Sequence, residues 1–394
     1  MSIVLSASVR QNLLSLQSTA DLLSTTQNRL ATGNKVNSAL DNPTNFFTAQ
    51  GLNNRASDIN NLLDSIGNGV QVLQAANTGI TSLQKLVDTA KSIANQVLQA
   101  PAGYSTKSSV TSGANAGGTA ANLLGATLVQ GDVLTIAATG GGTASSITFG
   151  TGGAEVDTLT ELNAALAPNN LQASVNDTTG AITITTTNDK ASATVGALGG
   201  TAIGAGKAFL PASTTVVAAV ADTASQTIRS SLVKQYNDII TQVTTTSQDA
   251  SFNGINLLNG DDLKLTFNET GKSTLNIKGV TFNAAGLGLA SLTSGTDFLD
   301  NSSANAALVK LSAASTTLRT QASSLGSNLS VVQIRQDFNK NLINVLQTGS
   351  SNLTLADTNE EAANSQALST RQSIAVSALA LANQSQQSVL QLLR

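Results

Sequence analysis

The sequence predicts a mainly α-helical protein with an α+β insert, long coiled-coil-like helices at both ends and a core β-hairpin. Three observations predict this class. Apolar residues recur at every third and fourth position over long stretches near both ends, which is the spacing of helices that pack side by side. Residues 105–215 lose that spacing and show short alternating runs typical of strands. Two further alternating runs follow at 263–267 and 275–280.

The first helical stretch carries a heptad seam, a line of positions that alternate in steps of four and three. These positions are Val9, Leu13, Leu16, Ala20, Leu23, Gln27 and Leu30. The C-terminal stretch keeps the same spacing, with interruptions at Arg371 and Ser385. Its positions are Leu368, Ala375, Ala378, Ala382, Val389 and Leu392. We therefore expect the two ends of the chain to form helices that close on each other along these positions.

Three more helices are expected between the two ends. Apolar residues at helical spacing cover 59–97 on two faces, and Pro101 marks the end of that helix. The same spacing returns at 225–246 and again at 308–345. We expect Gly349 to break the last of these helices, because glycine is a weak helix former.

The insert at 105–215 is rich in Ser, Thr, Gly and Ala. Alternating runs predict strands at 133–136, 147–149, 171–175 and 181–185, and helical spacing predicts a short helix at 158–166. The run 176–180 reads as a hairpin loop. We expect a small, surface-facing α+β domain, and a disordered Ser/Thr-rich linker is the alternative.

Composition argues against several classes of function. The 394 residues include no Cys and no His, so the chain lacks thiolate nucleophiles and the commonest general base and metal ligand. We expect no catalytic residues, no metal site and no cofactor. Charged residues are only 11% and form no basic stripe, so no nucleic-acid partner is expected. No apolar run is long enough to span a membrane, and the N-terminus does not resemble a Sec signal peptide.

The turn after the first helix carries a family resemblance. Residues 29–33 read Arg-Leu-Ala-Thr-Gly, residues 36–39 read Val-Asn-Ser-Ala, and Asp41 follows. This run resembles the spoke between the first two helices of bacterial flagellins, and it places the spoke motif at Arg29, Gly33, Asn37, Ser38 and Asp41. The family usually has a second acidic residue where this chain has Asn42. Taken alone, the run is equally consistent with an ordinary helix–turn–helix.

Two later phrases strengthen the resemblance. Residues 249–258 are similar to the flagellin phrase that leads from a helix into the core hairpin, and 355–394 are similar to the flagellin C-terminus. The resemblance covers roughly 1–100 and 222–394. The chain departs from the family in one respect. In many flagellins the extra outer domain follows the core hairpin, whereas in this chain the outer domain comes before the hairpin.

The resemblance implies a three-part architecture. Residues 1–40 and 350–394 would form an inner tube, 41–104 and 216–349 a helical core with the β-hairpin, and 105–215 an outer insert. The implied function is that of a structural subunit that polymerises into the flagellar filament for swimming motility. Alternatives are a hook–filament junction protein or a flagellin-like surface adhesin that acts through its outer domain.

The resemblance also implies partners and a location. The main partner would be the chain itself, as a helical homopolymer, with the flagellar export apparatus, a secretion chaperone, and junction and cap proteins as further partners. The protein would be extracellular and exported by flagellar type III secretion. Many flagellins are recognised by a Toll-like receptor through an Arg, a Glu and a Leu, which fall here at Thr89, Ser92 and Ile93. Because Thr89 and Ser92 replace the charged Arg and Glu, and only the apolar residue is kept in kind, weak activation of that receptor is expected.

Overall fold

The computed structural model describes residues 7–211 and 215–392, and these divide into two compact units. Unit 1 holds the described residues up to Val70, the segment Lys264–Asn276 and the described residues from Ser330 onward. Unit 2 holds Gln71–Leu263 and Ile277–Leu329, apart from the undescribed 212–214. The mainly helical class with a β-rich insert is confirmed. The three-part division at residues 40, 104, 215 and 349 stays a prediction.

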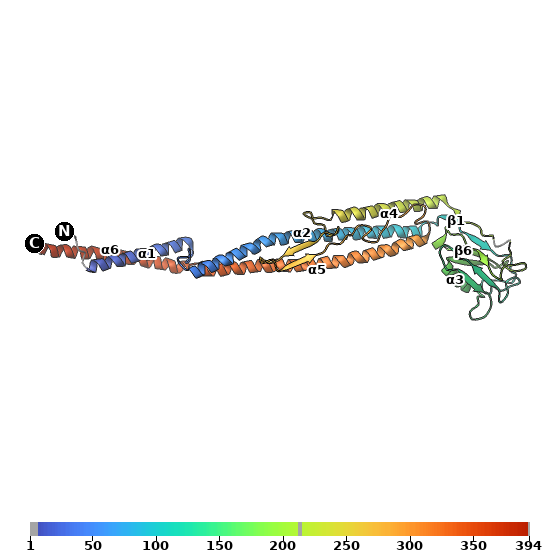
Figure 1. Cartoon of the computed structure of the whole chain (residues 1–394), viewed down its shortest axis with the longest axis horizontal. Helices are drawn as coiled ribbons and strands as arrows, with labels where there is room; N and C mark the ends of the chain where they lie inside the picture. Colours follow the sequence, from blue (N-terminus) through green and yellow to red (C-terminus); the bar gives the residue numbers. More distant parts are fainter. Residues whose placement is uncertain (1–6, 212–214, 393–394) are drawn as a thin grey trace. The chain divides into compact units, whose positions relative to one another are not determined.

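Figure 1 shows the helices and strands in chain order. The helices are α1 (Ala7–Thr32), α2 (Pro43–Gln99), α3 (Leu159–Leu166), α4 (Thr223–Asp249), α5 (Asn301–Thr354) and α6 (Thr358–Leu392). The strands are β1 (Tyr104–Thr106), β2 (Ser109–Thr111), β3 (Val133–Ile136), β4 (Ser145–Thr148), β5 (Leu171–Asn176), β6 (Ala181–Thr186), β7 (Leu198–Gly199), β8 (Val220–Ala221), β9 (Leu263–Thr266) and β10 (Thr274–Ile277). Short 3-10 turns lie at Ala167–Asn169 and Asn188–Lys190.

Unit 1 is built from two helix pairs and the tip of the core hairpin. α1 lies along α6, and the start of α2 packs on the end of α5 through the apolar side chains Ala56, Ile59, Ile343 and Leu346. The tip of the β9–β10 hairpin is tied to both of the latter helices. Arg55 of α2 forms a 2.8 Å ion pair with Glu269, and the Asn339 amide of α5 donates a 3.0 Å hydrogen bond to the Phe267 carbonyl.

α5 does not end at Gly349, so the predicted break there is wrong. The helix continues to Thr354, and the Ser350 hydroxyl donates a 3.2 Å hydrogen bond to the Ala49 carbonyl of α2. A lone glycine inside a helix costs only about 1 kcal/mol, and packing against a neighbouring helix outweighs that cost. The sequence signal for a helix end was therefore real but too weak to decide the outcome.

Unit 2 contains the rest of α2, α4 and the first part of α5. Arg229 of α4 is almost fully buried, and its guanidinium donates to the carbonyls of Ala100, Pro101 and Phe298 and to the Asn301 side chain at 2.8–3.2 Å. Burial lowers the pKa of this guanidinium, while the nearby Asp300 carboxylate opposes the shift. One side chain thus joins the end of α2 to the start of α5.

The insert in unit 2 is a folded α+β domain and not a linker. Its two antiparallel sheets have the strand orders β2-β6-β5 and β4-β3-β7, and α3 packs beside β4 and β5. The predicted short helix and the predicted strands are confirmed within one or two residues. The helix begins with a capping box between Thr158 and Glu161, and the predicted 176–180 loop closes through Gly180 at a φ of +67°. The core residues are Val110, Leu123, Leu128, Leu134, Ile136, Ile147, Phe149, Leu162, Leu166, Leu171, Ile182, Ile184, Val195, Ala202, Ala208 and Phe209.

Close packing at one glycine of α2 yields a test of unit 2. A Cβ atom placed on Gly79 would lie 2.6 Å from the Ala250 Cβ and 2.7 Å from a Leu258 methyl group. We expect Gly79→Ala to lower the free energy of unfolding by about 1–3 kcal/mol, because the backbone of the 250–258 segment must move. Urea denaturation of the monomer measures this change.

The matched control is Gly67→Ala on the same helix, where no atom lies within 4 Å of the new Cβ. It should raise the free energy of unfolding by up to about 1 kcal/mol, because alanine is the better helix former. Equal effects of the two variants would contradict the described packing.

Candidate functional site

The turn after α1 and the link between α5 and α6 are joined by main-chain hydrogen bonds. The N–H groups of Lys35 and Val36 donate to the Thr354 carbonyl at 2.7 and 3.3 Å, and the Ala356 N–H donates to the Gly33 carbonyl at 2.9 Å. Gly33 has a φ of +70°, a conformation that glycine adopts without strain. The turn therefore caps the end of α5, whose last carbonyls have no partner within their own helix.

Asp41 holds the same turn in shape. Its Oδ2 accepts hydrogen bonds from the Asn37 N–H at 3.0 Å, the Ser38 N–H at 2.8 Å and the Ser38 hydroxyl at 3.1 Å. The backbone donors of Ser38 and Asn37 lower the pKa of Asp41, because they stabilise its charged form. Asn37, Ser38 and Asp41, which the sequence predicted as parts of one motif, do form a single loop.

Arg29 connects this turn to the C-terminal helix. Its Nη1 lies 3.3 Å from Oε1 of Glu361, which is only 8% exposed. The sequence placed Glu361 at a helix N-terminus but gave no sign of this partner, which lies 332 residues away in the chain. Arg29 thus lies in the last turn of α1, and the other four spoke residues lie in the segment that joins α1 to α2 and contacts the α5–α6 link.

The face that α1 turns toward α6 differs from the predicted seam. Val9 is buried, and Leu16 and Leu23 are half-buried, as expected. Leu13 and Leu30 are exposed, and so is Gln27. Their expected places are taken by the buried Thr19 and Thr26 and the half-buried Asn12. The pairing of the two helices is confirmed, but the contact face is rotated from the predicted one, and Leu13 and Leu30 remain free for another partner.

α6 shows a similar departure. Leu368, Ala375 and Ala382 are half-buried, as predicted. Ala378 is exposed, and the half-buried Gln372 and Leu379 complete the contact face in its place. The side chains of Val389 and Leu392 lie outside the described ones. The role of the seam residues in assembly stays a prediction.

Pairing leaves much apolar surface uncovered on both helices. Leu14 is 68% exposed and Leu381 is 69% exposed, and the exposed large apolar side chains of the pair are Leu13, Leu14, Leu22, Leu30, Ile374, Val376 and Leu381. Several apolar side chains exposed along one helix pair mark a protein–protein contact more often than a free surface. This surface is therefore the candidate assembly site.

The three predicted receptor positions do not form one surface. Thr89 and Ser92 are exposed on α2, whereas Ile93 is only 6% exposed and packs inside unit 2. The Thr89 hydroxyl also donates to the Lys85 carbonyl of its own helix at 2.9 Å. Sequence alignment located the positions on the helix but could not show which of them face outward.

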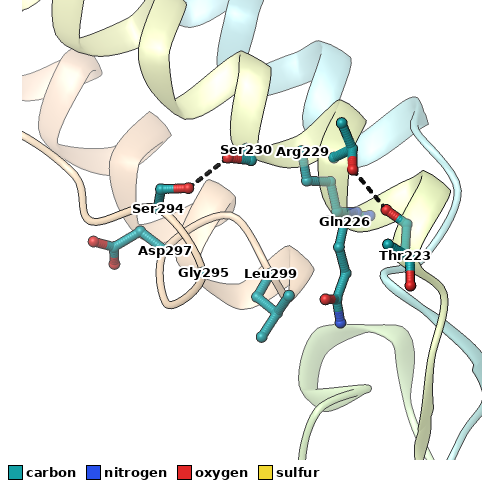
Figure 2. Close-up of a pocket in the computed structure, with 9 residues that line it drawn as sticks. Thr223, Gln226, Arg229, Ser230, Ser294, Gly295, Asp297 and Leu299 are labelled. Carbon is teal, nitrogen blue, oxygen red and sulfur yellow. Dashed lines mark hydrogen bonds between the residues drawn. The ribbon is translucent and has the colours of Figure 1, made fainter.

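A surface hollow lies where the start of α4 meets the 293–299 loop (Figure 2). Figure 2 shows Gln226 and Arg229 reaching from α4, and Ser294 and Asp297 lying on the loop. These polar groups already have partners, because Gln226 donates to the Gly103 carbonyl, Ser230 and Ser294 bond each other, and Asp297 accepts from the Thr293 N–H. We assign this hollow no ligand.

Among the described residues, none of the helices combines the length and apolarity that crossing a bilayer requires. Across residues 7–211 and 215–392, three or more His, Cys, Asp or Glu side chains do not gather in a geometry that suits a metal ion.

Comparisons with known proteins match both end regions of the chain. The family described as the bacterial flagellin N-terminal helical region matches residues 4–131, and the bacterial flagellin C-terminal helical region matches 308–393. Flagellins FljM and FljK of Caulobacter vibrioides are 31% and 32% identical over 179 and 180 residues, which are 45% of this chain. Flagellin A of Rhizobium meliloti is 34% identical over 124 residues, 32% of this chain and 27% of its own length. The alignments span 64% of the length of each Caulobacter relative.

The Asp41 loop yields a pH prediction. A lowered pKa means that the carboxylate stabilises the folded turn above its unfolded pKa of about 3.9, and that this contribution is lost as pH falls through the lower folded pKa. We expect Asp41→Asn to destabilise the spoke at neutral pH and to match the unmodified chain at acidic pH. Amide hydrogen exchange of Asn37 and Ser38 across this range measures the effect.

Asp64→Asn makes the same charge change at an exposed position of α2 and serves as the control. Identical exchange in the Asp41 variant and the unmodified chain at neutral pH would contradict the proposed role of the carboxylate.

Proposed function

Because the chain belongs to the bacterial flagellin family, we propose that it is a structural subunit that polymerises into a bacterial flagellar filament for swimming motility. The supporting observation is the apolar surface that remains exposed after α1 and α6 have paired. A monomer gains nothing from leaving these side chains in water, whereas many copies packed along their terminal helices bury them. We assign the chain no catalytic activity.

The mechanism of assembly is head-to-tail association. A contact between two different surfaces of the same chain leaves one free surface at each end, so copies add without closing and form a helix. α1 and α6 have almost no charge on their exposed faces apart from Arg10, Asp21, Glu360 and Arg371. Low charge on helices that pack closely avoids the cost of burying unpaired ions.

We propose the three-part division for the assembled state. The terminal segments 1–40 and 350–394 form the inner tube, 41–104 and 216–349 form the surrounding helical core, and 105–215 faces outward. The folded core of the insert supports this proposal, because a domain with its own apolar core does not need the helices for its stability.

The proposed location is the extracellular filament, reached through the flagellar type III export apparatus with a secretion chaperone. Junction and cap proteins would contact only the ends of the polymer. The alternatives, a hook–filament junction protein or an adhesin that uses the insert, are not favoured, because the relatives reported above are named flagellins. The number of copies in sheared filaments separates a filament subunit from a junction protein, which is present in few copies.

Assembly should depend on the half-buried Leu16 of α1. Leu16→Asp places an unpaired charge at the contact with α6, a cost on the order of 3 kcal/mol for each subunit. We expect the variant chain to be exported yet to form no filaments, as measured by electron microscopy of the culture medium.

Thr178→Asp introduces the same charge at an exposed position of the insert, which the proposed division places outside the tube, and should still form filaments. Normal filaments from the Leu16 variant would refute the proposed role of the α1–α6 contact.

Recognition by the Toll-like receptor should be weak. Thr89 and Ser92 are exposed but lack the charges of the Arg and Glu that the family resemblance implies for these positions. Receptor signalling by purified monomer should therefore be low, and Thr89→Arg combined with Ser92→Glu should raise it. Losing a buried charged contact typically weakens binding by about 2–5 kcal/mol, so a large difference is expected. Strong signalling by the unmodified chain would show the mapping to be wrong.

A further inference from the structure

A line of exposed apolar side chains runs along α5 within unit 1. Val331, Ile334, Phe338 and Val345 are between 43% and 67% exposed. Their steps of three, four and seven place them on one face of the helix over about 21 Å. Residues on the exposed flanks of this face are polar, for example Gln333, Asp337, Lys340 and Asn344. We call Val331, Ile334, Phe338 and Val345 the α5 stripe. Heptad spacing on an otherwise polar surface is typical of a helix-packing site.

A second exposed apolar set lies around the start of α2. Leu40, in the turn before the helix, is 96% exposed, and Phe47, near the beginning of the helix, is 61% exposed. Among the described residues of unit 1 outside α1 and α6, Leu355 is the remaining large apolar side chain with a similar exposure. Unit 1 therefore carries two separate apolar sets that its own fold does not bury.

We propose that the α5 stripe of one copy packs against Leu40 and Phe47 of a second copy. The inference rests on the proposed function and deepens it by naming the two surfaces that meet. If the stripe met the same stripe on a partner, that contact by itself would close as a two-fold dimer and could not extend a polymer. Joining two different surfaces leaves one of each free at the ends, which is what an open polymer requires.

The size of the stripe fits a polymer contact and not a stable dimer. Four side chains of this kind bury on the order of 400 Å², about half of the ~800 Å² that each partner buries in a stable complex. The contact therefore holds only together with other contacts along the polymer. Charge does not oppose it, because Asp337 and Lys340 beside Phe338 lie 3.8 Å apart and neutralise each other.

The absence of cysteine from the chain allows a direct test. Phe47→Cys and Phe338→Cys are combined in one chain, polymers are formed, and a short bis-maleimide reagent is added. We expect a ladder of covalent multimers on a denaturing gel, because each copy would be linked to the next. If the double variant assembles poorly, the two single variants are doped into polymers of the unmodified chain, and covalent dimers that require both variants are expected.

The matched control pairs Phe47→Cys with Asn344→Cys. Asn344 is exposed six residues from Phe338, about 120° round the helix, so its pair should give no ladder. Polymers without a Phe47–Phe338 product, a ladder of equal intensity from the control, or dimers from the single Phe338 variant alone would each overturn the contact. If the unmodified chain forms no polymer at all, the proposed function fails and the contact fails with it.

Discussion

The main-chain hydrogen bonds between the 33–36 turn and the end of α5 are the constraint on which unit 1 depends. Two long helices at opposite ends of a chain pair only if their connections bring them together in a fixed register. Gly33 supplies the left-handed turn, and the N–H groups that follow it satisfy the Thr354 carbonyl. A side chain at position 33 would strain the turn, and a shift of one residue would leave a helix end without hydrogen-bond partners. The Arg29–Glu361 ion pair then fixes α1 beside α6.

This constraint explains how a monomer can present apolar surface without collapsing onto it. Once the turn fixes the register, α1 and α6 bury one face each, and the geometry of two helices leaves their outer faces in water. Leu14 and Leu381 are exposed for this reason and not because packing is poor. Assembly then adds contacts to the apolar faces that pairing leaves exposed.

Periodic spacing predicted most of the fold. The order of the helices, the short helix of the insert and the core hairpin were predicted, because periods of 3.6 and 2 depend only on local sequence. The ends of the long helices were not: α2 begins at Pro43 although apolar spacing starts only at Ile59, and α5 spans Asn301–Thr354 although the predicted stretch is 308–345. The face of contact could not be predicted in the same way. Thr19 can lie in the contact face because its hydroxyl donates a 2.8 Å hydrogen bond to the Ser15 carbonyl of its own helix, and a pattern of apolar residues gives no weight to such a side chain.

Long-range partners were also beyond sequence reasoning. Glu361 meets Arg29, and Arg229 meets four groups from two other segments, although nothing in the local sequence indicates these partners. The spoke motif is the exception, because the family resemblance marked its residues before the structure showed their loop. Tertiary packing likewise carried α5 past Gly349, where local propensity alone predicted an end.

The central claim is that this chain assembles by itself into an open helical polymer. The most direct measurement is electron microscopy of purified monomer after short sheared filament fragments have been added as seeds. The account predicts long helical filaments that grow from the seeds, with loss of monomer from solution. Seeds that keep their length while the protein stays monomeric, or that collect closed oligomers of fixed size, would contradict it.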